Sequence, residues 1–358
     1  MTFDASLKAW LALSLTRGLG GESARRLLRE FGSPDAVFAA STSSLKSVVK
    51  ADLAAEISNG ITDDAVVPAL AWLEDNNNHI VTLADSDYPQ ALLNIPDPPL
   101  LLYVKGRLDL LNRPALAVVG SRSATPQGIN NAEAFAKSLS DAGLCIISGL
   151  AHGIDAGAHR GALRGQGSSI AVVGTGLDKV YPAANRDLAH TLAQQGALVS
   201  EFPLATPPLA ANFPRRNRLI SGMSLGCLVV EASLQSGSLI TARLALEQGR
   251  DVFAIPGSIH APQSKGCHAL LKQGAKLVET AQDILEELGD LSFPPAPAAD
   301  PAVPDAALLE HLGFDPVDVD TLSMRSGLTI AALSAMLLTL ELGGRICVLP
   351  GGLYQRIQ

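Results

Sequence analysis

The stretch Ala115-Leu-Ala-Val-Val-Gly-Ser-Arg-Ser-Ala-Thr-Pro-Gln-Gly128 passes from an apolar run through a turn of small residues into a helix-like segment. The five apolar residues at its start fit a buried strand. A turn of this kind brings unpaired backbone N–H groups together, and the dipole of the following helix adds partial positive charge there. The stretch therefore predicts a β-strand, a phosphate-binding turn and a helix.

Arg122 occupies a place in this turn that decides between two kinds of ligand. The usual dinucleotide fingerprint has a glycine two residues after the first one, and here Arg122 stands there. A guanidinium adds a full charge and a planar fork for phosphate oxygens. The turn therefore favours a phosphodiester over a buried pyrophosphate. Gly174-Thr-Gly176 also departs from the fingerprint, because Lys179 stands where the third glycine is needed.

Six further apolar runs follow the strand at 116–119, and helical patterns separate them. The runs lie at 145–148, 170–173, 198–200, 228–230, 252–255 and 276–278. Alternating strands and helices predict an α/β fold, a Rossmann-like, doubly wound parallel sheet of seven strands. Such sheets bind ligands at the carboxyl ends of their strands.

The regions on either side of the sheet differ from it in pattern. Residues 1–80 are predicted to form a small helical domain of the helix-hairpin-helix or SAM-like kind, with a glycine-rich turn at 18–21. That turn either offers N–H groups to DNA phosphates or is a plain helix–helix connection. The Rossmann-like domain then covers 81–289, and residues 290–304 form a Pro/Ala linker.

Residues 305–358 predict a small winged-helix domain: three helical segments at 308–312, 319–326 and 330–342, then a β-hairpin at 343–354. This part holds six acidic and three basic residues, a net charge of −3. An acidic surface is a poor reader of DNA, so we expect a protein-contact or structural role.

Composition limits the class of protein further. The 358 residues are 47% hydrophobic and 4% aromatic, with a formal charge of −8, so a polyanion must meet a local basic patch. The four cysteines form no CxxC pair, which favours a reduced, cytoplasmic protein without a zinc site. No apolar segment of about 18 residues suggests a membrane span.

The candidate binding residues come from the strand ends and from the basic string 215–218. Arg215-Arg216-Asn217-Arg218 places three guanidiniums within four residues of an otherwise acidic chain. With Arg122 they give about four positive charges near the phosphate-binding turn. The full predicted set is Gly120, Ser121, Arg122, Gly149, Gly153, Gly174, Gly176, Phe213, Arg215, Arg216, Asn217, Arg218, Ser236, Gly237, Ser238 and Lys265.

Catalytic and metal-binding alternatives find little support in the sequence. Gly222-Met-Ser-Leu-Gly226 matches the G-x-S-x-G string, but it precedes a strand, whereas a nucleophile elbow follows one. His152 and Asp155 could form a base and its orienting group, or Asp155 could make a local loop contact. The histidines show no metal-ligand spacing with acids or cysteines. We therefore predict no catalytic residue, no metal and no cofactor.

Taken together, these motifs resemble the DNA-processing protein A family (DprA, also called Smf). The strings that carry the resemblance include Gly120-Ser-Arg122, Ser148-Gly-Leu-Ala-His-Gly-Ile-Asp155, Tyr181-Pro182, Phe213-Pro-Arg-Arg-Asn-Arg218 and Pro256-Gly257. One departure is His268, where the family often has asparagine. The resemblance implies a non-enzymatic, homodimeric protein that binds and protects incoming single-stranded DNA in natural transformation and loads the RecA recombinase onto it.

Two other classes of function stay open at this point. Rossmann-like nucleotide phosphoribohydrolases resemble a Pro-Gly-Gly-x-Gly-Thr motif followed by a catalytic Glu, and here Pro256-Gly257 is followed by Ser-Ile. A pure adaptor whose turn holds a structural anion is the third possibility.

Overall fold

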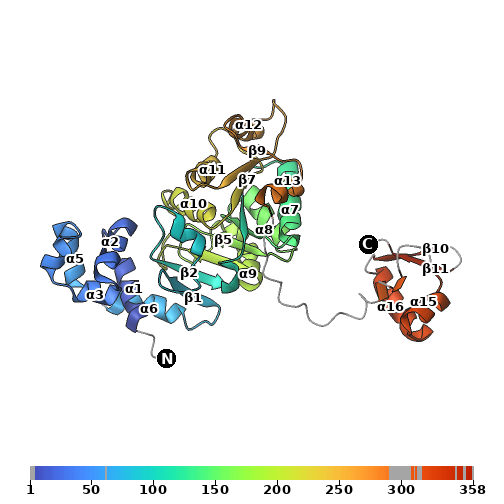
Figure 1. Cartoon of the computed structure of the whole chain (residues 1–358), viewed down its shortest axis with the longest axis horizontal. Coiled ribbons are helices and arrows are strands. Elements are labelled where there is room, and N and C mark those ends of the chain that lie inside the picture. The colour runs from blue at the N-terminus through green and yellow to red at the C-terminus, as the bar shows by residue number, and fades with distance from the viewer. Residues whose placement is uncertain are drawn as a thin grey trace. The chain divides into compact units, whose positions relative to one another are not determined.

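The computed structural model describes residues 5–60, 63–289, 308–309, 311–312, 317–342, 345–349 and 352–356. They belong to two compact units, Met1–Ser292 and Phe293–Gln358 (Figure 1). The predicted linker lies outside the described residues, and the finer division into domains at residues 80, 289 and 304 stays a prediction. No helix in the described ranges combines the length and apolar character needed to cross a bilayer.

The first unit is built on a nine-stranded sheet with the order β1-β2-β6-β5-β4-β3-β7-β8-β9. Seven of its strands pair in parallel, as the sequence predicts. They are β3 (Ala115–Val119), β4 (Cys145–Ser148), β5 (Ser169–Val172), β6 (Ala197–Ser200), β7 (Gly226–Val229), β8 (Asp251–Ala254) and β9 (Lys276–Leu277). The doubly wound, Rossmann-like sheet is therefore confirmed.

Two antiparallel strands extend one edge of this sheet. β1 (Asn78–Thr82) pairs with β2 (Leu101–Gly106), and β2 pairs with β6. Neither strand is among the seven that the sequence predicts for the parallel sheet. Gly106 lets β2 approach the start of β6 closely, because a Cβ there would lie 2.4 Å from the carbonyl oxygen of Gly196.

Helices cover both faces of the sheet because the parallel strands are apolar throughout, so that each face carries apolar side chains. In β3, Ala117 faces a core that includes residues of α10, α11 and α12, while Leu116 and Val118 face α7, α8 and α13. The helices of the sheet region are α7 (Pro126–Asp141), α8 (Ile154–Ala162), α9 (Arg186–Gln195), α10 (Asn212–Gly222), α11 (Ser238–Glu247), α12 (Lys265–Lys272) and α13 (Ala281–Leu288).

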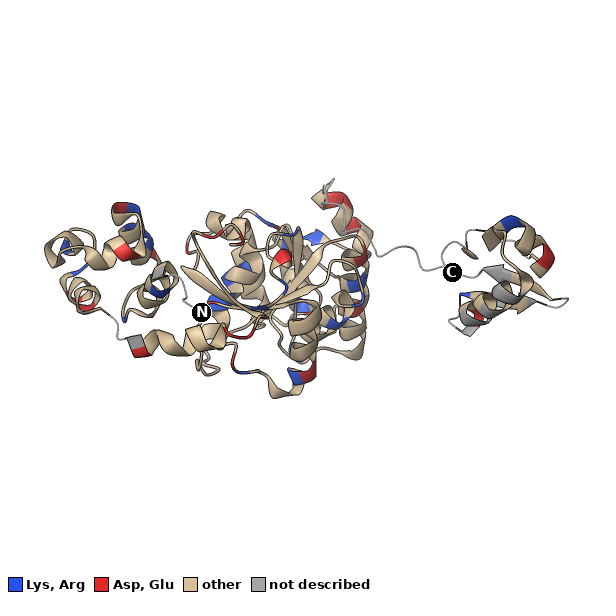
Figure 2. Cartoon of the chain, turned by 90° about the horizontal axis from the view of Figure 1, so that it is seen from below, with Lys and Arg blue, Asp and Glu red and all other residues tan. Residues whose placement is uncertain are grey.

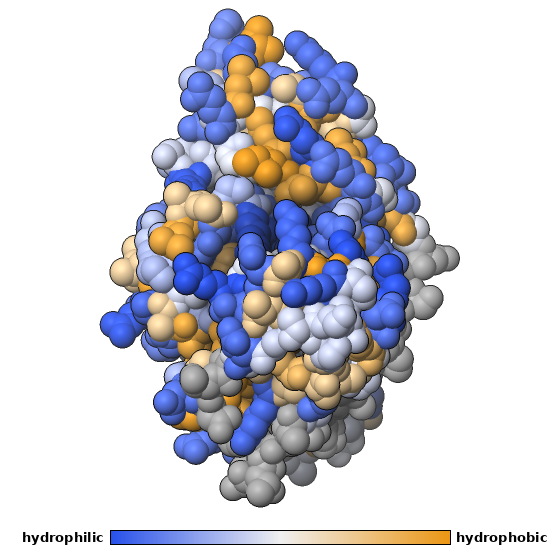
Figure 3. Space-filling view, turned by 90° about the vertical axis from the view of Figure 1, so that its left-hand side faces the viewer, coloured by the Kyte–Doolittle hydropathy of each residue, from blue (hydrophilic) through white to orange (hydrophobic). Residues whose placement is uncertain are grey.

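Six helices precede the sheet and share a core with it. They are α1 (Ala5–Leu15), α2 (Gly21–Phe31), α3 (Pro34–Ala39), α4 (Thr42–Lys46), α5 (Ala51–Asn59) and α6 (Asp63–Trp72). Leu11, Leu27 and Leu45 are fully buried within this helical region, and Tyr103 of β2 belongs to the same core. Figure 2 shows basic and acidic residues interspersed rather than gathered on one face. Figure 3, which looks on to the N-terminal end, shows mainly hydrophilic residues with apolar patches between them.

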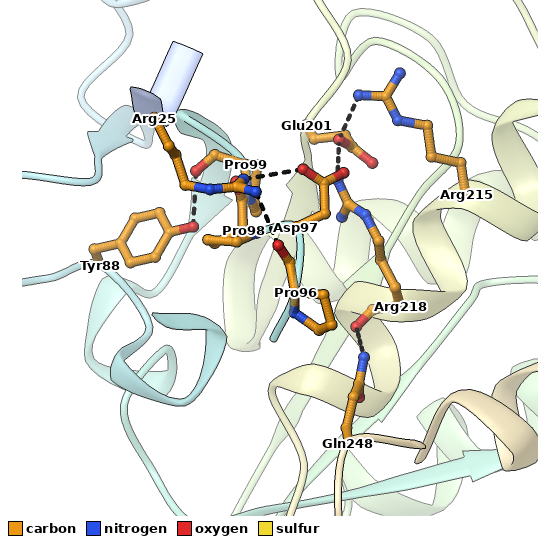
Figure 4. A network of polar contacts seen from close by, with 10 residues as sticks. All are labelled: Arg25, Tyr88, Pro96, Asp97, Pro98, Pro99, Glu201, Arg215, Arg218 and Gln248. Carbon is orange, nitrogen blue, oxygen red and sulfur yellow. Dashed lines mark hydrogen bonds and ion pairs between the residues drawn. The ribbon is translucent and has the colours of Figure 1, made fainter. Parts of the chain in front are cut away.

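The start of α2 is occupied by a carboxylate of the chain itself. Arg25 of α2 donates to Asp97 Oδ1 at 3.0 Å and to the carbonyl oxygens of Pro96 and Pro98 (Figure 4). A Cβ on Gly21 would lie 2.3 Å from the same Asp97 oxygen. The glycine-rich turn therefore docks α2 against the loop before β2, which is the packing expected of a helix–helix connection.

His159 of α8 is a fully buried, neutral histidine in the sheet core. Its Nε2 accepts the N–H of Leu150 at 3.3 Å, and its Nδ1 pairs with the hydroxyl of Ser169 at 2.8 Å. Burial, with the charges of Arg216 and Arg160 nearby, lowers the pKa of His159 to about 3. The ring therefore holds the loop after β4 without carrying a charge.

This depressed pKa predicts a loss of stability in mild acid. Between pH 6.5 and pH 5 an unfolded histidine takes up a proton that folded His159 does not. The free energy of unfolding should therefore fall by about 2 kcal/mol over that window. Chemical denaturation at several pH values measures it. A His159→Gln variant should show a shallower dependence, and equal slopes in the two proteins would contradict the assignment.

The second unit has the elements of a winged helix. α15 (Val319–Ser326) and α16 (Ile330–Leu342) precede an antiparallel hairpin of β10 (Ile346–Leu349) and β11 (Leu353–Arg356). Leu322, Leu333 and Ile346 lie in its core. Of the first predicted helix, residues 308–309 and 311–312 are described and helical.

Candidate nucleic-acid interface

A cavity of about 620 Å³ lies at the topological switch point of the sheet. β3 pairs with β4 on one side and with β7 on the other, so the chain leaves the middle of the sheet in opposite directions. Loops that diverge at such a point leave a crevice at the carboxyl ends of the strands. The cavity is lined by the loops after β3, β4, β5, β6 and β7 and by residues of α10 and α11.

The loop after β3 forms one wall of this cavity. Ser121 N–H donates to the carbonyl oxygen of Glu231 at 2.7 Å, and Ser121 Oγ accepts the N–H of Ser123 at 3.1 Å. A Cβ on Gly120 would lie 2.6 Å from a side-chain carbon of Ile154, so only glycine fits there. Arg122 is exposed and extends from this fixed loop into the cavity lining.

The N-terminus of α7, where the sequence predicts a phosphate, already holds a carboxylate. Glu231 accepts the N–H of Thr125 at 2.9 Å and its hydroxyl at 2.5 Å. A Cβ on Gly128 would lie 2.3 Å from the carboxyl carbon of Glu231. An external anion at this helix start would have to displace Glu231. The groups left for a ligand are therefore Arg122 and the hydroxyls of the cavity.

Arg122 and two aromatic rings form a layered surface at the cavity. The Arg122 guanidinium lies 5.7 Å from the centre of the Phe213 ring, and the Tyr181 ring centre lies 5.5 Å from that of Phe213. A Cβ on Gly174 would lie 3.1 Å from the Phe213 ring. Gly174 therefore leaves room for the ring. Tyr181, 45% exposed, also lines the cavity, although the sequence interpretation left it out of the site.

Arg216 is a buried structural arginine that reaches the cavity with part of its surface. It is 4% exposed, and its Nη1 donates to the carbonyl oxygens of Gly149, at 2.8 Å, and of Val172. Its Nε donates to Asn217 Oδ1 at 3.0 Å. A Cβ on Gly149 would lie 2.4 Å from Arg216 Nη2. The side chain thus ties α10 to the ends of β4 and β5.

Asp155 is the buried counter-charge of Arg216. Its carboxylate accepts the N–H groups of Gly149 at 3.2 Å and Ala151 at 3.3 Å, which is the local loop contact considered above. Burial raises the pKa of Asp155, and Arg216 opposes that shift. Burial also lowers the pKa of Arg216 to about 10, so the guanidinium stays charged at neutral pH.

Arg215 and Arg218 point away from the cavity and share one carboxylate. Arg218 Nη2 lies 2.7 Å and Arg215 Nη2 3.1 Å from Glu201 Oε2 (Figure 4). Arg218 also lies 3.4 Å from Asp97, the residue that Arg25 contacts. Of the four positive charges expected near the phosphate-binding turn, Arg122 and Arg216 line the cavity and these two arginines do not, so their contact with a ligand stays a prediction.

The remaining predicted residues divide in the same way. Ser236 and Ser238 line the cavity with their hydroxyl oxygens 2.7 Å apart, and Gly237 between them has open space where a Cβ would stand. The cavity lining includes Gly120, Ser121, Arg122, Phe213, Arg216, Asn217, Ser236, Gly237 and Ser238. It does not include Gly149, Gly153, Gly174, Gly176, Arg215, Arg218 and Lys265.

Two glycines outside the lining have packing roles. Gly153 has φ +75° at the start of α8, and a Cβ there would lie 2.3 Å from the carbonyl oxygen of Ser121. A Cβ on Gly176 would lie 2.5 Å from Asp178 Oδ1. Lys265 is exposed at the start of α12. Contact of these three residues with a ligand stays a prediction. Among the described residues, no cluster of His, Cys, Asp and Glu is placed to hold a metal ion.

Comparison with known proteins decides the family. The family model described as DNA recombination-mediator protein A matches residues 79–289, which is more than half of the chain. The chain belongs to this family. A second model, described as the DprA winged helix domain, matches residues 293–352. The members of the family are recombination mediators and not enzymes, which sets the phosphoribohydrolase alternative aside.

Individual members of the family are similar over most of the chain. Protein Smf of Escherichia coli is 47% identical over 305 residues, 82% of this chain and 81% of that protein. The solved structure of Streptococcus pneumoniae DprA has a TM-score of 0.70 and 38% identity, and covers 81% of this chain and 100% of its own.

A Helicobacter pylori relative bears on the ligand. The structure of its DNA processing protein A, described for a unique single-stranded DNA binding mode, has a TM-score of 0.54 and 32% identity. It covers 59% of this chain and 95% of its own.

Proposed function

We propose that this chain binds single-stranded DNA in the switch-point cavity, with Arg122 and Phe213 as the main contacts. The observation that carries the proposal is the exposed Arg122 guanidinium 5.7 Å from the Phe213 ring centre, at a cavity lined by serine hydroxyls. A guanidinium suits a backbone phosphate, and an aromatic ring suits an unpaired base. The Helicobacter pylori relative supports the same ligand class.

The charge distribution supports a single strand over a duplex. The chain carries a formal charge of −8, so its surface as a whole repels DNA. Binding must come from a few local contacts, and stacking requires bases that are not paired within a duplex. Phe213 and Tyr181 supply such a surface beside Arg122.

The full proposed role is that of a mediator that hands its strand to a recombinase. The chain would act in the cytoplasm during natural transformation, protect incoming single strands and load RecA onto them, as a homodimer joined through its Rossmann-like domain. The acidic winged-helix unit would serve a protein contact rather than the main DNA contact. Family membership supports this role.

A strand-exchange assay with DNA already coated by single-strand-binding protein tests the proposal. Adding this protein should speed the loading of RecA, and no nucleotide or phosphodiester bond should break. The Arg122→Ala variant should lose the acceleration. No acceleration by a protein that still binds single strands would refute the mediator step. Cleavage lost on changing Asp155 or Glu231 would favour an enzyme.

A further inference from the structure

A second cavity, of about 820 Å³, lies among the N-terminal helices and gathers basic side chains. It is bounded by the turn after α1, by α2, and by the segment from the end of α4 through the first turns of α5. Four cations line it: Arg17, Arg26, Lys46 and Lys50. All four are exposed, so they are available to a ligand from solvent.

The basic cavity stands out against the composition of its surroundings. Residues 1–60 contain seven basic and six acidic residues. The cavity takes four of the bases and only two of the acids, Asp52 and Glu56. The rest of this region therefore holds three bases and four acids, and the positive charge is concentrated at one place.

The four cations of the basic cavity form no ion pair within the described part of the chain. Arg26 donates to the carbonyl oxygen of Val48, which fixes its guanidinium at the cavity. Ser23 and Ser47 add hydroxyl groups to the lining. Cations and hydroxyls together suit an anion with several oxygens, such as a phosphate.

The basic cavity is also linked by direct contacts to the proposed DNA site. α2 carries Arg26 at the cavity and Arg25 one residue earlier. Arg25 pairs with Asp97, which lies 3.4 Å from Arg218 on α10 (Figure 4). α10 in turn presents Phe213 and Arg216 to the switch-point cavity. The two cavities therefore belong to one connected part of the unit.

We propose that the basic cavity is a second contact for the phosphate backbone of the same single strand. The proposal rests on the proposed function, because it extends the bound strand beyond the switch-point cavity. A short oligonucleotide would occupy the switch-point cavity alone, and a longer one would also reach Lys46 and Lys50. Affinity and salt dependence should therefore both rise with strand length.

The test compares two double variants on labelled oligothymidylates of increasing length. Lys46→Ala with Lys50→Ala removes two cations of the basic cavity, whereas Lys8→Ala with Arg29→Ala removes two exposed cations of α1 and α2 outside it. On long strands the first variant should lose about 1.4 from the slope of log affinity against log salt, about 0.7 for each phosphate contact. On short strands it should match the wild type. The control variant should match it at every length.

The outcomes separate the two proposals. Equal slopes for both double variants on long strands would overturn the second contact and leave the switch-point site standing. An equal loss on short and long strands would also overturn it, because the lysines would then act at the first site. Wild-type protein that binds no oligothymidylate would refute the proposed function itself. Thermal unfolding of both variants checks that the exposed cations were removed without loss of fold.

Discussion

Replacing Arg216 with alanine is expected to lower the free energy of unfolding by about 3–5 kcal/mol, because it leaves buried polar groups unpaired and removes the positive charge that acts on buried Asp155. The variant would leave Asp155 buried without its counter-charge. It would also leave the carbonyl oxygens of Gly149 and Val172 without the donor that they share. Gly149 follows β4 and Val172 is the last residue of β5, so the loss should destabilise the backbone next to the switch-point cavity.

Urea unfolding of Arg216→Ala beside Arg215→Ala measures this difference. Arg215 is 57% exposed, and its partner Glu201 keeps Arg218, so its removal should cost at most about 1 kcal/mol. Two variants of equal stability would show that Arg216 is no more than a surface charge.

Replacing Arg122 with alanine should weaken single-strand binding by about tenfold to a hundredfold without loss of stability. A charge-assisted hydrogen bond contributes about 1.5–3 kcal/mol, and about 1.4 kcal/mol corresponds to tenfold. Arg122 is exposed and its guanidinium lies over Phe213, so its removal leaves no buried group unpaired. Fluorescence anisotropy with a labelled oligothymidylate measures the loss. An unchanged affinity would remove Arg122 from the site.

The parallel sheet could be predicted from sequence because each of its strands is a separate apolar run followed by a helical pattern. β2 could not be assigned in the same way. Its run, Leu101–Gly106, follows the prolines at 96–99, and between it and β3 comes a three-residue 3-10 helix, Leu108–Leu110, and no α-helix. Its pairing with β6 is antiparallel and joins segments about 95 residues apart in the chain, which local periodicity does not encode.

The basic string could be found from sequence, but the direction of each side chain could not. All three arginines lie in α10, which begins at Asn212. Within a helix, Arg215 and Arg218 are three apart and share a face, while Arg216 lies on another. That spacing sends two guanidiniums to Glu201 and one into the sheet. Which arginine points to Glu201 and which to the sheet therefore depends on where the string lies within α10.

Two helix starts illustrate a further limit of sequence interpretation. The turns before α2 and α7 are both possible anion sites by sequence, and a carboxylate of the chain itself lies at each, Asp97 and Glu231. Glu231 lies 106 residues from Thr125 in the sequence. The local pattern predicts that an anion is favourable there. It cannot say whether the anion comes from a ligand or from a distant side chain.

The salt dependence of binding by Arg122→Ala, on a single strand and on a duplex of the same length, tests the central claim most directly. Arg164→Ala is the matched control. Arg164 is exposed, lies just beyond the end of α8 and pairs with Glu133. A helix that follows a parallel strand ends near the amino ends of the strands, so Arg164 lies far from the switch-point cavity at their carboxyl ends. We predict that wild type and Arg164→Ala prefer the single strand with equal salt slopes, and that Arg122→Ala loses about 0.7 from that slope. Equal slopes in all three proteins, or equal affinity of the wild type for the duplex, would contradict a single-strand site at the switch point.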